Sequence, residues 1–85
     1  MSTAVITDAE ARVNIGDNIK AILKTKGWSQ GELARQSGES AMNVSRIING
    51  VNLPNAAILA RLAEALEVST DYLISRHGKN SKKSA

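Results

Sequence analysis

Apolar residues recur three and four positions apart along most of this chain, which is the spacing of an amphipathic α-helix. The first clear stripe predicts a helix over residues 15–26 and consists of Ile15, Ile19, Ile22 and Leu23. Gly27 marks its end, because glycine readily adopts the left-handed conformation that closes many helices. Upstream, Thr7 and Glu10 form a capping-box pattern, so residues 8–13 are expected to be a helical leader or to run into this helix.

A second stripe predicts a helix over residues 56–66 and consists of Ile58, Leu59, Leu62, Ala63 and Leu66. Pro54 favours extended backbone before this helix, and Asn55 can cap its first turn. Ser69 is a candidate cap for a short last helix that ends near Ile74. No stretch shows the alternation of a half-buried strand, and no repeat is visible, so the pattern indicates an all-α chain.

Between the two stripes, the sequence predicts two short helices joined by a turn. They are expected over residues 30–37 and 41–48, with Ser40 as the N-cap of the second. The small side chain of Ala34 allows the helices to cross closely, and Gly38 can adopt the positive φ that the turn needs. This is a helix-turn-helix, a unit whose second helix is shaped to lie in the major groove of DNA.

The second of these helices carries an inward apolar stripe, Val44 and Ile47, opposite a polar face. From about Ile15 to Leu73 the chain resembles the phage repressor and Cro-like helix-turn-helix family, also called the XRE family. The landmarks that match in order are Ser29-Gln30, Glu32-Leu33-Ala34, Gly38, Val44, Ile47, Asn49-Gly50, Pro54 and Ala65-Leu66-Glu67-Val68-Ser69. The resemblance implies a compact five-helix lambda-repressor-like domain and a sequence-specific transcriptional regulator, most simply a repressor.

The length of 85 residues allows one domain with a modest core. We expect a leader over residues 1–13, the DNA-binding domain over 14–75 and a basic, disordered tail over 76–85. The sequence has no cysteine, hence no disulfide framework and no thiolate metal site. The N-terminus lacks a signal-peptide pattern and no segment could span a bilayer, so a cytoplasmic protein is expected.

The net charge of +3 is concentrated at the C-terminus. Of the 11 basic residues, four lie in the last ten positions, which contain no acid: Arg76, Lys79, Lys82 and Lys83. Residues 1–75 therefore hold seven basic and eight acidic groups. Bulk charge cannot carry a DNA-binding interpretation, which has to rest on where individual cations lie. The tail can attract phosphates non-specifically or can serve only to keep the chain soluble.

The candidate base contacts are the exposed residues of the helix over 41–48, namely Ala41, Met42, Asn43, Ser45 and Arg46. Arg46 can donate two hydrogen bonds to guanine O6 and N7, and Asn43 can pair with adenine N6 and N7. Ala41 and Met42 could read only a thymine methyl group. Two alternatives stay open: Met42 tucked against the protein surface, and Arg46 bound to a phosphate.

The candidate phosphate contacts follow from the resemblance and are Gln30, Ser40, Asn49, Gly50 and Asn55. Helix N-termini suit this role because their free N–H groups and dipole attract anions. The sequence departs from well-known family members at Ala41, where a glutamine often bonds to the residue equivalent to Gln30. Because that partner is missing here, the family's base contacts transfer less directly.

Short members of the family act as two-fold dimers on palindromic sites. We expect a homodimer whose candidate interface is Tyr72, Leu73 and Ile74, with the N-terminal leader as a possible contributor; alternatively, all three residues complete the protomer core. Trp28 is expected to fill the core in preference to stacking on a base. The length fits a phage regulator, a restriction-modification controller or an antitoxin.

A protein-binding module, such as an antitoxin that holds a toxin and binds DNA only secondarily, is the alternative function. The near-neutral region before the tail and the apolar Ala41-Met42 pair favour it. An enzyme is not expected, because no nucleophile lies beside a base, His77 stands alone in the tail, and neither a phosphate-binding glycine loop nor a metal-ligand cluster is present. No cofactor is expected.

Overall fold

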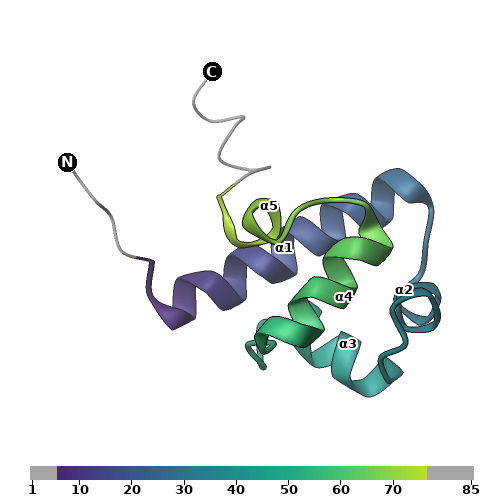
Figure 1. The fold of residues 1–85 in the computed structure, drawn as a ribbon, viewed down its shortest axis with the longest axis horizontal. Coiled ribbons are helices and arrows are strands. Elements are labelled where there is room, and N and C mark those ends of the chain that lie inside the picture. Colours follow the sequence, from purple (N-terminus) through teal and green to yellow (C-terminus); the bar gives the residue numbers. More distant parts are fainter. Residues whose placement is uncertain (1–5, 77–85) are drawn as a thin grey trace.

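The computed structural model describes residues 6–76, and these residues form five α-helices with no strand among them. The helices are α1 (Asp8–Lys26), α2 (Gln30–Ser37), α3 (Ala41–Ile48), α4 (Ala56–Leu66) and α5 (Thr70–Ile74). Figure 1 shows α5 lying against the middle of the long α1, while α2 and α3 lie together on the side away from α5. The expected all-α, five-helix architecture is confirmed.

The N-terminal leader and the first predicted core helix form one continuous helix, α1. Its start is the predicted capping box: the Thr7 hydroxyl accepts from the Glu10 amide at 3.1 Å, and the Glu10 carboxylate accepts from the Thr7 amide at 3.0 Å. Gly27 ends α1 with φ of 72°. The helix is continuous across residues 13 and 14, the predicted boundary between the leader and the domain.

The other four helices each begin at a polar residue whose side-chain oxygen accepts a first-turn amide. The caps are Ser29, Ser40, Asn55 and Ser69, which accept from Glu32 (3.0 Å), Asn43 (3.0 Å), Ile58 (2.9 Å) and Tyr72 (3.0 Å), respectively. Each such cap stabilises its helix by about 1 kcal/mol. The predicted caps at Ser40, Asn55 and Ser69 are thus confirmed, and the local sequence alone fixes where these helices begin.

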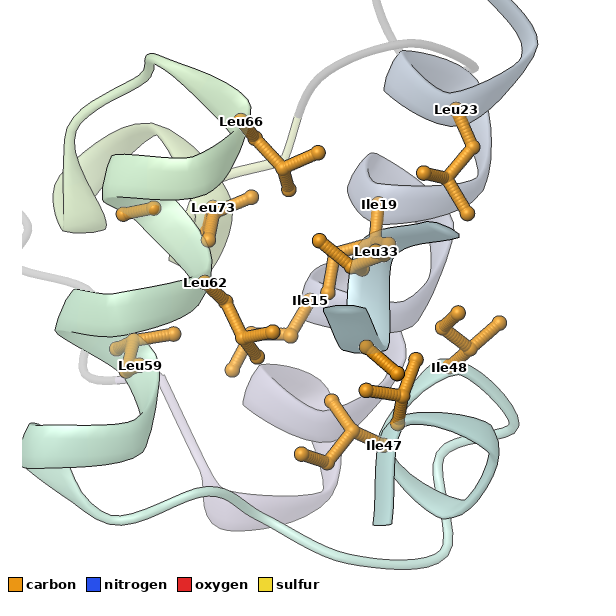
Figure 2. Close-up of a cluster of buried hydrophobic side chains, with 13 residues drawn as sticks. Ile15, Ile19, Leu23, Leu33, Ile47, Ile48, Leu59, Leu62, Leu66 and Leu73 are labelled. Carbon is orange, nitrogen blue, oxygen red and sulfur yellow. The ribbon is translucent and has the colours of Figure 1, made fainter. Parts of the chain in front are cut away.

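All five helices contribute apolar side chains to one core, as Figure 2 shows. The side chains that are at most 1% exposed are Ile15, Ile19, Leu33, Val44, Ile47, Leu62 and Leu73. Trp28 is half-buried and packs against this core, as expected, with the Lys26 amino group 4.9 Å from its ring centroid. The predicted stripes of α1, α3 and α4 are therefore the faces that meet.

Two contacts that position α1 were not expected from the sequence. Gly16 lies where α1 meets the end of α3, and a Cβ atom there would collide with the carbonyl oxygen of Ile48. Asn18 is 4% exposed and its Nδ2 donates to the carbonyl oxygens of Tyr72, Leu73 and Ser75 at 3.1, 2.8 and 2.7 Å. Carbonyl groups at the C-terminal end of a helix have no partner within that helix. Asn18 of α1 supplies the donor for such carbonyl groups at the end of α5.

The predicted tail begins at Arg76, which is exposed, and the remainder of the tail, including His77, lies outside the described residues. The leader, domain and tail boundaries therefore stay predictions. No helix within residues 6–76 has both the length and the apolar character needed to cross a membrane.

Candidate nucleic-acid interface

The turn between α2 and α3 has the geometry that the sequence predicted. Gly38 adopts φ of 77° and ψ of 15°, and its amide donates to the Ala34 carbonyl oxygen at 3.0 Å. Ala34 on α2 is buried, and Val44 and Ile47 on α3 are each 1% exposed. Because α3 buries this stripe against the protein, its other face is turned to solvent.

Three of the five predicted base-contact residues are exposed on that outer face. Ala41 and Arg46 are exposed, and Met42 is 63% exposed, so most of the Met42 surface is open to solvent. Among residues 6–76, Arg46 makes no hydrogen bond or ion pair that would hold its guanidinium away from a partner. Asn43 and Ser45 are half-buried.

Asn43 already has a partner within the protein. Its Nδ2 donates to Glu39 Oε1 at 3.2 Å. Glu39 Oε2 accepts from Nε of Arg61 on α4 at 2.8 Å and forms an ion pair with Nη2 of Arg61, also at 2.8 Å. Neither Glu39 nor Arg61 was expected at this site from the sequence. The four-residue spacing of Glu39 and Asn43 was a visible signal, but the ion pair joins residues 22 positions apart and has no local signature.

Three of the predicted phosphate contacts lie at helix N-termini. Gln30 is the exposed first residue of α2, and Ser40 and Asn55 cap α3 and α4. The side-chain oxygens of both caps accept amides of their own helices, so an anion there would meet the remaining first-turn N–H groups. The structure thus brings donors to these positions, and the phosphate contacts themselves stay predictions.

The predicted contacts at Asn49 and Gly50 have a different geometry. The Asn49 amide donates to the Ser45 carbonyl oxygen at 3.0 Å and the Gly50 amide donates to the Ile47 carbonyl oxygen at 3.1 Å. Both backbone N–H groups are therefore used to close α3. The Asn49 side chain is exposed and makes one long bond, from Nδ2 to Ser45 Oγ at 3.4 Å, so it is the group that could reach a phosphate.

A second carboxylate cluster lies on α2. Glu32 accepts from Gln36 Nε2 at 2.7 Å and from the Arg35 guanidinium. These hydrogen bonds, from Gln36 first and Arg35 second, favour the charged carboxylate and hold the pKa of Glu32 below its ordinary value. Arg35 is thereby partly committed to a neighbour on its own helix, unlike Arg46.

The candidate dimer surface needs one correction. Leu73 is 0% exposed in the protomer core, so its side chain cannot contact a second copy. Tyr72 is 38% exposed and Ile74 is half-buried. Ile74 also lines an open hollow of about 520 Å³ between the start of α1 and the end of α5, together with Ile6, Glu10, Asn14, Asp71, Ser75 and Arg76. Residues 6–76 contain no group of side chains suited to a metal ion.

Comparison with known proteins places this geometry in a family. The sequence profile of the helix-turn-helix family HTH_3 matches residues 19–73, which include all of α2, α3 and α4, the C-terminal part of α1 and most of α5. The chain belongs to the HTH_3 helix-turn-helix family. The match covers the region in which the landmarks of the XRE family were recognised, so that resemblance is confirmed.

Individual HTH_3 relatives agree with this assignment. The chain is 38% identical over 58 residues, 68% of its length, to the uncharacterized HTH-type transcriptional regulator YazB of Bacillus subtilis (strain 168), of which it covers 84%. It is 33% identical over 66 residues, 76% of its length, to the HTH-type transcriptional repressor RghR of the same organism. The chain spans about half, 49%, of the length of RghR.

A solved HTH_3-like fold extends the comparison over nearly the whole chain. The hypothetical transcription factor NHTF from Neisseria superposes with a TM-score of 0.78 at 25% identity, covering 98% of this chain and 95% of that one. The HTH_3 family consists of DNA-binding transcription regulators and not of enzymes. The predicted class of function, a DNA-binding transcription regulator, is therefore confirmed.

Proposed function

We propose that this HTH_3 protein represses transcription by inserting α3 into the major groove of an operator. The single observation that carries the proposal is the orientation of α3. Its stripe of Val44 and Ile47 is buried, and its opposite face exposes Met42 and Arg46. A helix held in this way presents its N-terminal residues to base edges. RghR, named as a repressor, supports the sign of regulation.

The proposed base contacts differ in chemistry. Arg46 donates to guanine O6 and N7, and Asn43 pairs with adenine N6 and N7, each contact giving about 1–3 kcal/mol of discrimination. Ala41 and Met42 contact a thymine methyl group, and Ser45 lies beside them. Arg46 has an alternative role as a phosphate contact, which would give affinity without sequence preference.

The proposed phosphate contacts position α3 and do not specify sequence. They are Gln30 at the start of α2, Ser40 and Asn55 at the starts of α3 and α4, and Asn49 after α3. The amides of Asn49 and Gly50 close α3, so the Asn49 side chain is the group proposed to bind there, and Gly50 serves only to turn the chain. These contacts explain how a near-neutral domain can bind DNA, because they use helix N-termini and neutral donors in place of bulk charge.

We propose a two-fold homodimer with half-sites about one helical turn apart, roughly 34–36 Å. Tyr72 and Ile74 form part of the proposed interface. Support comes from apolar residues of the leader that remain exposed, Ile6 at 41% and Val13 at 55%. Ile6 and Ile74 line the same hollow, so a second copy could cover both at once.

The decisive experiment is binding-site selection from a random DNA duplex pool at ~150 mM salt, which weakens non-specific phosphate attraction. A palindrome with half-sites about one turn apart is expected. Recovery of a single half-site would reject the proposed dimer but not the proposed sequence-specific binding. Recovery of no common sequence would reject the proposed operator recognition.

Two substitutions separate specification from positioning. Arg46→Ala should weaken binding to the selected sequence by about 1–3 kcal/mol and leave non-specific affinity almost unchanged. Gln30→Ala should weaken binding to all sequences alike. If Arg46→Ala leaves the sequence preference intact, Arg46 is a phosphate contact.

A protein-binding module is the second candidate function, and exposed apolar side chains beside α3 favour it. Met42 is 63% exposed, and Val51 and Leu53 in the following loop are 64% and 41% exposed. Exposed apolar side chains suit a protein partner if they adjoin in one patch, as in an antitoxin that holds a toxin. Failure of the selection to recover any sequence, together with monodisperse folded protein, would favour this function.

A further inference from the structure

Glu39 occupies the turn between α2 and α3 and is held there by its backbone and its side chain. Its amide donates to the Ala34 carbonyl oxygen at 3.1 Å. Its side chain is only 10% exposed, although it lies between two short helices at the surface. One carboxylate oxygen, Oε1, faces Asn43, and the other, Oε2, faces Arg61. Glu39 thus links the start of α3 to α4.

The two oxygens of Glu39 do different things. Oε2 accepts a hydrogen bond from Arg61 Nε at 2.8 Å and pairs with Arg61 Nη2 at 2.8 Å, so the guanidinium offsets the carboxylate charge that would otherwise repel DNA phosphates. Oε1 takes the bond from Asn43 Nδ2 at 3.2 Å. An ionised carboxylate can only accept hydrogen bonds. The amide of Asn43 must therefore turn its NH2 group, and not its oxygen, toward Glu39.

This constraint matters because an asparagine amide can present either end to a base. Its oxygen and nitrogen have nearly the same shape and differ only in accepting or donating. With NH2 held by Glu39, Asn43 keeps Oδ1 and one N–H for a partner, which complement adenine N6 and N7. With the amide reversed, the NH2 group would face the base and could donate to guanine O6 or N7 instead.

We infer that Glu39 is a positioning residue that sets the base preference of α3 by fixing the amide orientation of Asn43. The inference rests on the proposed function, because it requires Asn43 to face a base. In this arrangement Glu39 does not touch DNA. It makes Asn43 a reader of adenine. Arg61 only offsets the charge of the carboxylate, because Glu39 is also held by the bond from its own amide to the Ala34 carbonyl oxygen.

The chain offers matched controls. Arg61→Ala removes the link from Glu39 to α4 but leaves the bond between Glu39 and Asn43. If Glu39 acted only by linking α3 to α4, Arg61→Ala and Glu39→Ala would therefore change the base preference equally. Glu32→Ala removes another carboxylate that binds an arginine and an amide, Arg35 and Gln36, but within α2 alone. Neither control should alter what Asn43 reads.

The test is binding-site selection followed by competition between duplexes that differ at one base pair. Asn43→Ala first identifies the position that Asn43 reads, as the one at which the adenine preference disappears. Glu39→Ala should lower the adenine-over-guanine preference at that position by about tenfold. Arg61→Ala and Glu32→Ala should retain that preference, and in an Asn43→Ala background Glu39→Ala should change it no further.

Unchanged preference in folded Glu39→Ala would overturn the inference, as would an equal loss in Arg61→Ala or a further loss in the Asn43→Ala background. If the wild-type chain selects a sequence but Asn43→Ala changes no position, the inference fails while the proposed function stands. If the wild type selects no sequence, the proposed function fails first. Should Glu39→Ala unfold, Glu39→Gln replaces it, because its amide can donate as well as accept and no longer imposes one orientation.

Discussion

The helix-turn-helix and the packing of α5 on α1 are built in opposite ways. In α2 and α3, each cap and turn is made by residues within a few positions: Ser29, Ser40 and Gly38 each act on the helix beside them. At the other end, Asn18 binds carbonyl groups 54 to 57 positions further along the chain. The helix-turn-helix is therefore specified by neighbouring residues, whereas the packing of α5 on α1 depends on residues that are far apart in the sequence.

The length of α5 explains why it needs distant partners. A helix of five residues has too few internal hydrogen bonds to be stable in water by itself. Ser69 caps its start, Leu73 anchors it in the core, and Asn14 and Asn18 bind its last carbonyl groups. We therefore expect damage to the α1–α5 contact to reduce stability, and damage to the outer face of α3 to reduce DNA binding only.

The largest effect is expected at Leu73. Leu73→Ala should lower the free energy of unfolding by about 2–5 kcal/mol, because the side chain is fully buried. Its neighbour Tyr72 is 38% exposed and provides the control, since Tyr72→Ala should have a much smaller effect on the protomer. Urea unfolding measures both. If Leu73→Ala kept its stability and changed the oligomeric state instead, the assignment of Leu73 to the core would be wrong.

The next effect is expected at Asn18. Asn18→Ala leaves three carbonyl oxygens without this donor and should cost about 1–3 kcal/mol of unfolding free energy. Asn14→Ala, which removes a single bond of 2.9 Å to the Ile74 carbonyl oxygen, should cost less. Hydrogen exchange of the α5 amides provides the measurement. Equal protection in Asn18→Ala and the wild type would show that burial of Leu73 alone holds α5.

A smaller effect is expected where α1 meets α3. Gly16→Ala should destabilise the protein by about 1–2 kcal/mol, since overpacking against the Ile48 backbone outweighs the gain in helix propensity. Gly31 on α2 is the control, because its nearest neighbour to an added Cβ is Ser29 Oγ at 3.7 Å. Gly31→Ala should stabilise the protein by about 0.5–1 kcal/mol. The melting temperatures of the two variants measure both effects. If both temperatures changed in the same direction, the close packing of Gly16 on Ile48 would be contradicted.

The smallest effect concerns the pKa of Glu32. Because Gln36 and Arg35 hold this pKa below its unfolded value, the cluster contributes stability at pH above the unfolded pKa and loses it as the pH falls through the lowered one. Titration of the carboxyl carbon by NMR should find the depressed pKa, and Gln36→Ala should raise it. A titration unaffected by this substitution would leave Arg35 as the only group responsible.

The exposed face of α3 could be predicted from the sequence, because the spacing of apolar residues within one helix decides which of its faces is buried. The buried stripe of Val44 and Ile47 determines which face of the helix is outward, so the exposure of Ala41, Met42 and Arg46 followed from periodicity. Glu39 could not be assigned in this way. Its partner Arg61 lies on another helix, and only the packing of α2 on α4 brings the two together.

Local sequence was sufficient to set where the helices begin and which face of each helix is buried, because caps, turn glycines and apolar stripes act over at most one or two helical turns. Tertiary structure alone decided that Gly16 meets Ile48, that Leu73 is core and not interface, and that Glu39 is bound by Asn43 and Arg61. These contacts depend on how whole helices cross, and a crossing is set by the sum of all packed side chains and not by any one stretch of sequence.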